Sequence, residues 1–302
     1  MKNYEIIQRI NRLKKEKNAV IYAHNYQLPE VQEIADYVAD SLGLARKAAE
    51  SDADVIVVCG VKFMAESASI LCPDKTILMP DPCAGCPMAN MITPEDVIRL
   101  KEEHPGAPTV AYVNTSADVK AEVDVCCTSS NAVNIVRNLK AKEIIFVPDK
   151  NLGSFVADKT GKNLILWNGF CPTHARIQPE EIMAEKQNHP KAKVIVHPEC
   201  TPEVIEIADE ALSTGEMLKY AKESDAKEFI IGTEIGMIYQ LEKQNPDKKF
   251  YPASTHASCP DMKITTLAKI LSCLENMEYE IKVPENIRVR AKKSIEKMVE
   301  TA

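Results

Sequence analysis

Three cysteines recur at an almost constant spacing and could together hold a metal group. Cys86, Cys171 and Cys259 are separated by 85 and 88 residues in a chain of 302 that has ten cysteines. Each follows a short apolar run, so each is expected in a loop just beyond a strand. Three thiolates at one point repel one another, and a cation between them would hold them together.

The kind of metal is limited by the number and softness of these ligands. Soft thiolates favour zinc or an iron–sulfur cluster. A structural zinc usually takes four ligands, often from paired Cys-x2-Cys knuckles, and this chain has one such pair, Cys83 with Cys86. Three single ligands fit a cluster in which one iron lacks a protein ligand and acts as a Lewis acid. A zinc site and three unrelated buried cysteines are the alternatives. We expect Cys83 to be a bystander, with a redox partnership with Cys86 as the other possibility.

Two pairs of proton-carrying side chains follow apolar runs with the same internal spacing. His24 and Tyr26 form one pair, and His197 and Glu199 form the other. Residues i and i+2 of an extended segment point to the same side, so each pair is expected to face one site. Both pairs could exchange protons with a substrate. The plainer interpretation of each pair is a strand end that runs into a turn.

The elements that would position these residues form a threefold repeat. Short apolar runs alternate with amphipathic helical stretches, which is typical of βαβ units. First strands are expected at 19–24, 109–112 and 194–197, second strands at 54–58, 143–147 and 228–231, and third strands at 76–79, 163–166 and 249–251. The pattern predicts an α/β fold of three pseudo-symmetric three-layer αβα modules with parallel sheets around a central active site. The modules are predicted at 1–105 with an N-terminal helix, 106–190, and 191–302 with a C-terminal helix that packs on the last module.

Shifts of 88 and then 85 residues place polar residues at equivalent positions of this repeat. The equivalent sets are His24, Tyr112 and His197; Tyr26, Asn114 and Glu199; and Ser41, Ser129 and Thr214. The carboxyl ends of parallel strands and the following helix starts lie at one edge, where ligands bind. A hydroxyl at a helix start caps free N–H groups, and the same helix end attracts phosphate or carboxylate. The three hydroxyls therefore indicate either ordinary caps or a shared anion site.

Charge and composition narrow the class of partner. The chain has 37 basic and 44 acidic residues and a formal charge of −7. A surface of this sign does not attract nucleic acid or an anionic membrane, so neither is expected as a partner. The charged amphipathic N-terminus is unlike a signal segment, and no apolar run reaches the roughly 18 residues of a membrane span. We therefore expect a cytoplasmic protein whose cysteines stay reduced.

At several of these positions the chain resembles the quinolinate synthase family, iron–sulfur enzymes of NAD biosynthesis. The resemblance runs from about residue 18 to residue 275. Its motifs are AHNYQ at 23–27, ADSL at 39–42, AGCPMA at 84–89, YVN at 112–114, TSSNA at 128–132, PDKNL at 148–152, HPE at 197–199, STG at 213–215, and Cys259 with MK at 262–263. Some members carry an extra cysteine near the third ligand, where this chain has Asp261 and Met262.

The resemblance implies a cofactor, a reaction and a role for each residue. It implies a [4Fe–4S] cluster that acts as a Lewis acid, with Cys86, Cys171 and Cys259 as ligands. The implied reaction joins iminoaspartate with dihydroxyacetone phosphate and yields quinolinate, phosphate and two waters. Acid–base roles would fall to Tyr26, His197 and Glu199. The residues implied to line the substrate site are His24, Ser41, Tyr112, Asn114, Ser129, His174, Ser213 and Thr214.

Other functions compete with this interpretation. The nearest rival is another cluster-dependent hydro-lyase that binds a different small acid, and only the product separates the two. The non-catalytic rivals are an iron–sulfur sensor or scaffold and a plain zinc protein. The family likeness also suggests functional coupling to an aspartate-oxidising enzyme, which would supply the unstable iminoaspartate.

Overall fold

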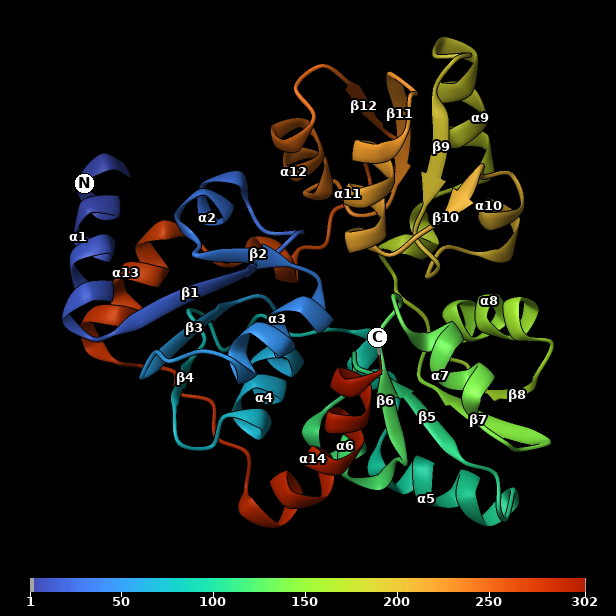
Figure 1. The fold of residues 1–302 in the computed structure, drawn as a ribbon, viewed down its shortest axis with the longest axis horizontal. Helices are drawn as coiled ribbons and strands as arrows, with labels where there is room; N and C mark the ends of the chain where they lie inside the picture. Colours follow the sequence, from blue (N-terminus) through green and yellow to red (C-terminus); the bar gives the residue numbers. More distant parts are fainter. Residues whose placement is uncertain (1–2, 302) are drawn as a thin grey trace.

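The computed structural model describes residues 3–301, which form three α/β modules arranged around a common centre (Figure 1). Each module contains one four-stranded parallel sheet. The first sheet holds β1 (Ala19–His24), β2 (Tyr37–Ala39), β3 (Val55–Cys59) and β4 (Thr76–Leu78); the second holds β5 (Thr109–Tyr112), β6 (Val125–Cys127), β7 (Glu143–Val147) and β8 (Asn163–Leu166); the third holds β9 (Lys193–Val196), β10 (Glu210–Ala211), β11 (Glu228–Gly232) and β12 (Lys249–Pro252). The predicted fold class is confirmed.

The three sheets have the same strand order, which establishes the repeat in three dimensions. The orders are β2-β1-β3-β4, β6-β5-β7-β8 and β10-β9-β11-β12. The inner strands are almost continuous apolar runs, and β3 is buried at every position. Parallel strands covered by helices on both faces have this composition, because neither face meets water.

Each sheet also has a short edge strand that the sequence pattern did not predict. The strands β2, β6 and β10 have only two or three residues, too few for a detectable alternation. An aspartate precedes each of them: Asp36, Asp124 and Asp209. Each carboxylate accepts the backbone N–H of the adjacent inner strand at 2.8 Å, from Ile21, Thr109 and Val194 respectively. These aspartates lie at equivalent positions of the repeat and mark where each edge strand begins.

Helices flank all three sheets (Figure 1). They are α2 (Pro29–Ile34), α3 (Ser41–Ala49) and α4 (Lys62–Leu71) in the first module, α5 (Pro94–Glu103), α6 (Ala117–Glu122), α7 (Ala132–Asn138) and α8 (Lys150–Thr160) around the second, and α9 (Pro179–Asn188), α10 (Pro202–Glu206), α11 (Thr214–Glu223) and α12 (Met237–Gln244) around the third. The connecting helices α5 and α9 pack on α6 and β11, so each contacts the module that follows it. The division of the chain after residues 105 and 190 stays a prediction.

The terminal helices pack on the first module, and the last of them joins it to the second. Helices α1 (Asn3–Glu16) and α13 (Leu267–Asn276) pack on each other, and their buried Ile10 and Leu274 share a core with Ile21 of β1. Helix α14 (Glu285–Glu300) packs on α3 and α4 of the first module and on α6 and β6 of the second. The prediction that the C-terminal helix packs on the last module is therefore wrong, because the chain returns to the first module after β12.

Hydrogen bonds at the end of α14 explain why it lies between two modules. Arg46 of the first module donates to the Val299 carbonyl at 2.7 and 3.0 Å. Asn131 of the second module donates to the Met298 carbonyl at 2.9 Å. The last carbonyls of a helix have no partner within the helix, and these two side chains supply one from each module. No helix in the range 3–301 is long and apolar enough to cross a membrane.

Candidate active site

A central cavity collects almost all of the predicted site residues. Strands β1 and β5 end at His24 and Tyr112, and His197 directly follows β9. The cavity wall includes thirteen of the fourteen predicted residues: His24, Tyr26, Ser41, Cys86, Tyr112, Asn114, Ser129, Cys171, His174, His197, Glu199, Thr214 and Cys259. Ser213 is the exception, because its hydroxyl bonds to the Glu216 carboxylate at 2.7 Å and caps α11.

The three cysteines chosen by spacing differ from the others in exposure. Cys86, Cys171 and Cys259 are half-buried on the cavity wall, Cys83 is exposed, and the remaining six cysteines are buried. Cys59 lies in β3 and Cys273 in α13, where each packs as a small apolar residue of the core. The cavity therefore brings together one thiol from each module.

A shared local structure follows each of the three cysteines. Each is succeeded by proline, and a 3-10 turn begins within three residues: η1 (Met88–Met91), η2 (His174–Arg176) and η3 (Asp261–Lys263). In each turn the backbone N–H three residues on donates to the cysteine sulfur, from Ala89, His174 and Met262 respectively. Backbone donors of this kind stabilise a thiolate and tune iron–sulfur ligands. The Cys-Pro pair was visible in the sequence at all three positions, but it also occurs at Cys72 and Pro73, so it does not select the trio by itself.

Burial keeps these thiols protonated unless a cation lies beside them. It raises the pKa of Cys86 to about 12, and it also raises the pKa of Cys171 and Cys259 above the usual thiol value. Ligand thiols must lose their protons, so metal binding at this point would release protons. The donor set, three half-buried thiols with backbone N–H donors, fits a soft metal group.

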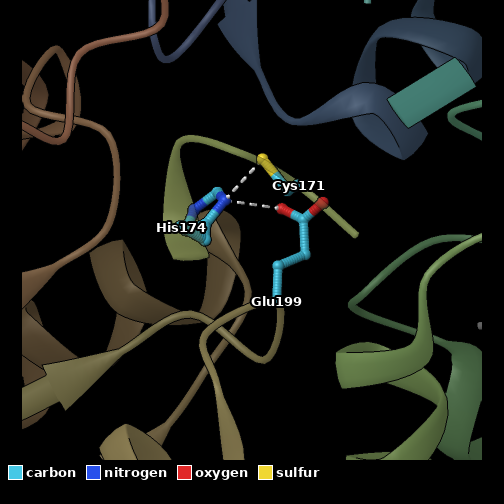
Figure 2. Close-up of side chains that lie close together, drawn as sticks. All are labelled: Cys171, His174 and Glu199. Atoms are coloured by element: carbon cyan, nitrogen blue, oxygen red, sulfur yellow. Dashed lines mark hydrogen bonds and ion pairs between the residues drawn. The ribbon is translucent and has the colours of Figure 1, made fainter. Parts of the chain in front are cut away.

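Glu199 lies at the centre of a buried imidazole–carboxylate cluster. Its Oε2 is 3.1 Å from His197 Nδ1 and 3.2 Å from His174 Nδ1. His174 Nδ1 is also 3.1 Å from Cys171 Sγ, and Figure 2 shows this nitrogen facing both the thiol and the carboxylate. Cys171, His174 and Glu199 together could hold a metal ion, since their ligand atoms lie within 4.8 Å of one another.

The charge state of this cluster follows from its surroundings. Burial alone would raise the pKa of Glu199, but His174 and the hydrogen bond from His197 outweigh it and hold that pKa below the usual value. Burial lowers the pKa of His174 to about 4. At neutral pH the site therefore contains a buried carboxylate beside a neutral His174 imidazole.

A hydrogen-bond chain connects Glu199 to Tyr26. Tyr26 Oη is 2.6 Å from Thr233 Oγ1, which is 2.9 Å from His174 Nε2. Since ionised Glu199 only accepts, neutral His174 donates from Nδ1 and accepts at Nε2. Thr233 must then donate to His174 and accept from Tyr26. Tyr26 keeps its proton, because burial and the nearby Glu199 raise its pKa well above 10.0.

Two of the three repeated hydroxyls, those of Ser41 and Thr214, do not cap the helices that they begin. Asp40 caps α3 and accepts from Gly43 N at 2.8 Å, while Ser213 caps α11. Ser41 and Thr214 are the first residues of those helices, and both line the cavity. Asn25 donates to Thr214 Oγ1 at 2.9 Å, which leaves the Thr214 proton free to point elsewhere.

The remaining predicted residues complete the wall. Ser129 Oγ is 3.2 Å from His197 Nε2. Burial raises the pKa of Tyr112 well above 10.0, so its hydroxyl is a donor. Asn114 Oδ1 is buried without a partner among the described residues, as is Glu199 Oε1. Buried polar atoms without partners are costly, and at this cavity they are positioned to bind a ligand.

Three functional candidates were missed from the sequence. Thr233 and Glu234 directly follow β11, and Asp149 follows β7 after Pro148. A shift of 85 residues makes Asp149 and Glu234 equivalent, and both are fully buried. The spacing that aligned the cysteines could therefore have identified these two carboxylates.

A buried cavity with three thiols, an ionised carboxylate and a connected acid–base chain defines an α/β enzyme for a small ligand. The chain matches the family model described as Quinolinate synthetase A protein over residues 8–300. It is 58% identical over 294 residues to the quinolinate synthase of Dehalococcoides mccartyi (strain CBDB1), covering 97% of each chain. It is 54% identical over 299 residues to that of Methanosarcina barkeri (strain Fusaro / DSM 804), covering 99% of this chain and 98% of the other. The chain belongs to the quinolinate synthetase A family, so the predicted family and the prediction of an enzyme are confirmed.

Proposed function

We propose that this enzyme condenses iminoaspartate with dihydroxyacetone phosphate to give quinolinate, phosphate and two waters. The substrates and products of this reaction balance without net oxidation or reduction. The reaction therefore needs proton donors and acceptors rather than an electron acceptor. The observation that carries the proposal is the single cavity that joins three thiols to a buried acid–base chain. Relatives of the chain are named quinolinate synthase, which supports the same activity.

Cys86, Cys171 and Cys259 would hold a [4Fe–4S] cluster. When bound, such a cluster supplies a Lewis acid for oxygen or nitrogen atoms of a substrate. The half-buried position of the three thiols and the backbone N–H donor on each sulfur support this ligand set. A single metal ion on Cys171, His174 and Glu199 is the competing arrangement, and metal analysis separates the two.

Glu199, Tyr26 and His197 would perform the proton transfers. Glu199 is ionised and its Oε1 has no partner in the part of the chain that the structure describes, so this oxygen can accept a substrate proton. Tyr26 holds its proton and can donate it to a leaving hydroxyl. His197 Nδ1 lies 3.1 Å from Glu199 Oε2 and can donate to this carboxylate, while its Nε2 lies 3.2 Å from Ser129 Oγ.

Both substrates are anions, and hydroxyl and imidazole groups would bind them. None of the described residues on the cavity wall is lysine or arginine. The hydroxyls of Ser41 and Thr214 lie at the starts of α3 and α11, where helix N–H groups favour negative charge. The other proposed substrate contacts are His24, Tyr112, Asn114, Ser129 and His174 on the wall, and Ser213 beside Thr214.

Iminoaspartate is an imine that water hydrolyses, so it must be formed shortly before this enzyme uses it. The class of reaction that forms it is oxidation of the amine-bearing carbon of aspartate. We therefore include functional coupling to an aspartate-oxidising enzyme in the proposal. A reducing cytoplasm would keep all ten cysteines as thiols, as they are in the structure.

Metal and product analysis of anaerobically purified protein tests the proposal. We expect about four irons and four sulfides per chain, and quinolinate from dihydroxyacetone phosphate with iminoaspartate formed in situ from oxaloacetate and ammonia. Cys86→Ser, Cys171→Ser and Cys259→Ser should each lose the cluster, whereas Cys83→Ser should keep it. A colourless zinc-containing protein, or iron protein that forms no quinolinate, would refute the proposal.

A further inference from the structure

Glu234 is a buried carboxylate that contacts the loop of the third cysteine. Its side chain is completely buried, and its Oε1 accepts the backbone N–H of Cys259 at 3.1 Å. Its Oε2 accepts the backbone N–H of Gly236 at 2.7 Å. The carboxylate therefore fixes the backbone at Cys259.

Lys263 extends this contact to the first module. Its ammonium is 2.9 Å from Glu234 Oε1 and 3.0 Å from Oε2, and it also donates to the backbone carbonyl of Tyr26. Lys263 lies four residues after Cys259, so a single short segment carries both a cysteine of the proposed cluster and the lysine that holds Tyr26. Gln32 braces the same backbone, because it donates to the carbonyls of Asn25 and Gln27 at 3.1 and 2.8 Å.

Gly236 indicates how closely these groups are packed. A Cβ at this position would lie 2.7 Å from Lys263 Nζ, 2.7 Å from the Tyr26 carbonyl oxygen and 2.8 Å from Glu234 Oε2. Any side chain here would push the three groups apart. The glycine thus leaves the space that the contact between Glu234, Lys263 and Tyr26 requires.

We propose that Glu234 and Lys263 are positioning residues that fix the Cys259 backbone and the Tyr26 backbone relative to each other. The inference rests on the proposed function, in which Cys259 binds the cluster and Tyr26 donates a proton. Glu234 acts through the Cys259 N–H, so it governs how firmly iron is held. Lys263 acts through the Tyr26 carbonyl, so it governs where the Tyr26 hydroxyl lies and affects turnover more than substrate binding.

Two variants separate these roles. Lys263→Met removes the donor to Tyr26 and retains the carboxylate on Cys259, so we expect normal iron content, nearly unchanged KM and a kcat lower by on the order of 100-fold. Glu234→Ala/Lys263→Met also removes the carboxylate and leaves no unpaired buried charge. In this double variant, iron should pass to an anaerobic chelator roughly 10–100-fold faster than in Lys263→Met. If Lys263→Met does not fold, Lys263→Gln is used in its place, because glutamine keeps a hydrogen-bond donor beside Glu234.

A matched ion pair on the surface provides the control. Lys243 and Glu33 also join the third module to the first, at 2.6 Å, but both side chains are 49% exposed. Lys243→Met should leave kcat and iron release unchanged. A Lys263 variant with wild-type kcat, or equal iron release with and without Glu234, would overturn the positioning roles. Wild-type protein without iron would instead overturn the proposed function, and the role of Glu234 in iron retention with it.

Discussion

Glu199→Gln is the substitution that most directly tests the proposed proton chemistry. The amide has the shape of the carboxylate but no charge, and it cannot accept a substrate proton. Its oxygen can still accept from His174 Nδ1, now 3.2 Å from Glu199 Oε2. The Asn151 side chain donates to the backbone carbonyl of Glu199 at 3.2 Å, and this contact is unaffected. We therefore expect the variant to fold and to keep its metal.

The size of the effect follows from the state of the carboxylate. The two histidines hold the pKa of Glu199 below its usual value, so the wild-type base is fully ionised at pH 7. Loss of a positioned general base typically lowers a rate roughly 10²–10⁴-fold. At about 1.4 kcal/mol per tenfold change, this raises the activation free energy by about 3–5 kcal/mol. Substrate binding does not require the proton transfer, so KM should change little.

The assay measures quinolinate formation under anaerobic conditions after iron and sulfide have been quantified in each sample. Glu203→Gln is the matched control, because Glu203 is four residues further along the chain and exposed on α10. It should retain wild-type kcat. A Glu199→Gln enzyme with full metal content and a kcat within a few-fold of wild type would refute Glu199 as the base. Equal loss of iron and activity would assign the residue to metal binding instead.

Three further substitutions test other parts of the structure. Thr214→Val should raise KM roughly tenfold with normal iron content, because a buried hydrogen bond is lost, whereas Thr214→Ser should not. Burial lowers the pKa of His24 from 6.5 to about 3, so the unfolded chain binds more protons between these values and stability falls as the pH drops below 6.5. Between pH 7 and about pH 4.5, protonation of His24 in the unfolded chain should lower the free energy of unfolding of wild-type apoprotein by about 3 kcal/mol. Urea unfolding measures this decrease, and His24→Gln should remove it. Arg46→Leu should lower the free energy of unfolding by roughly 2 kcal/mol, since the α14 carbonyls lose their charged donor.

The repeat was visible in the sequence because it is a property of local pattern and spacing. The inner strands are apolar runs, and Cys86, Cys171 and Cys259 keep their place relative to those runs. Strands β2, β6 and β10 were missed, since two or three residues leave no periodic signal. The position of α14 was predicted wrongly because its partners, such as Arg46 and Asn131, are far away in the chain.

The contacts between modules could not be derived from the sequence for the same reason. Thr233 touches both Tyr26 and His174, and neither contact has a counterpart at the equivalent positions of the other modules. A repeat predicts what its units share, but an active site at their junction depends on how they differ. The spacing made Glu199 equivalent to Tyr26 and Asn114, and only the folded chain brings His174 to it.

The difference between the modules has a physical reason at the position of Glu199. Equivalent positions in the first and second modules carry Tyr26 and Asn114, which are neutral at pH 7. A carboxylate at all three equivalent positions would add two like charges to a cavity whose wall already carries Asp40 and Glu234, and their repulsion would raise the pKa of each. A single carboxylate flanked by His174 and His197 keeps its charge. A thiol can occur in every module, because one metal group compensates the charge of all three thiolates. A carboxylate that acts as a base cannot be compensated in this way, because a bound cation would prevent it from accepting a proton.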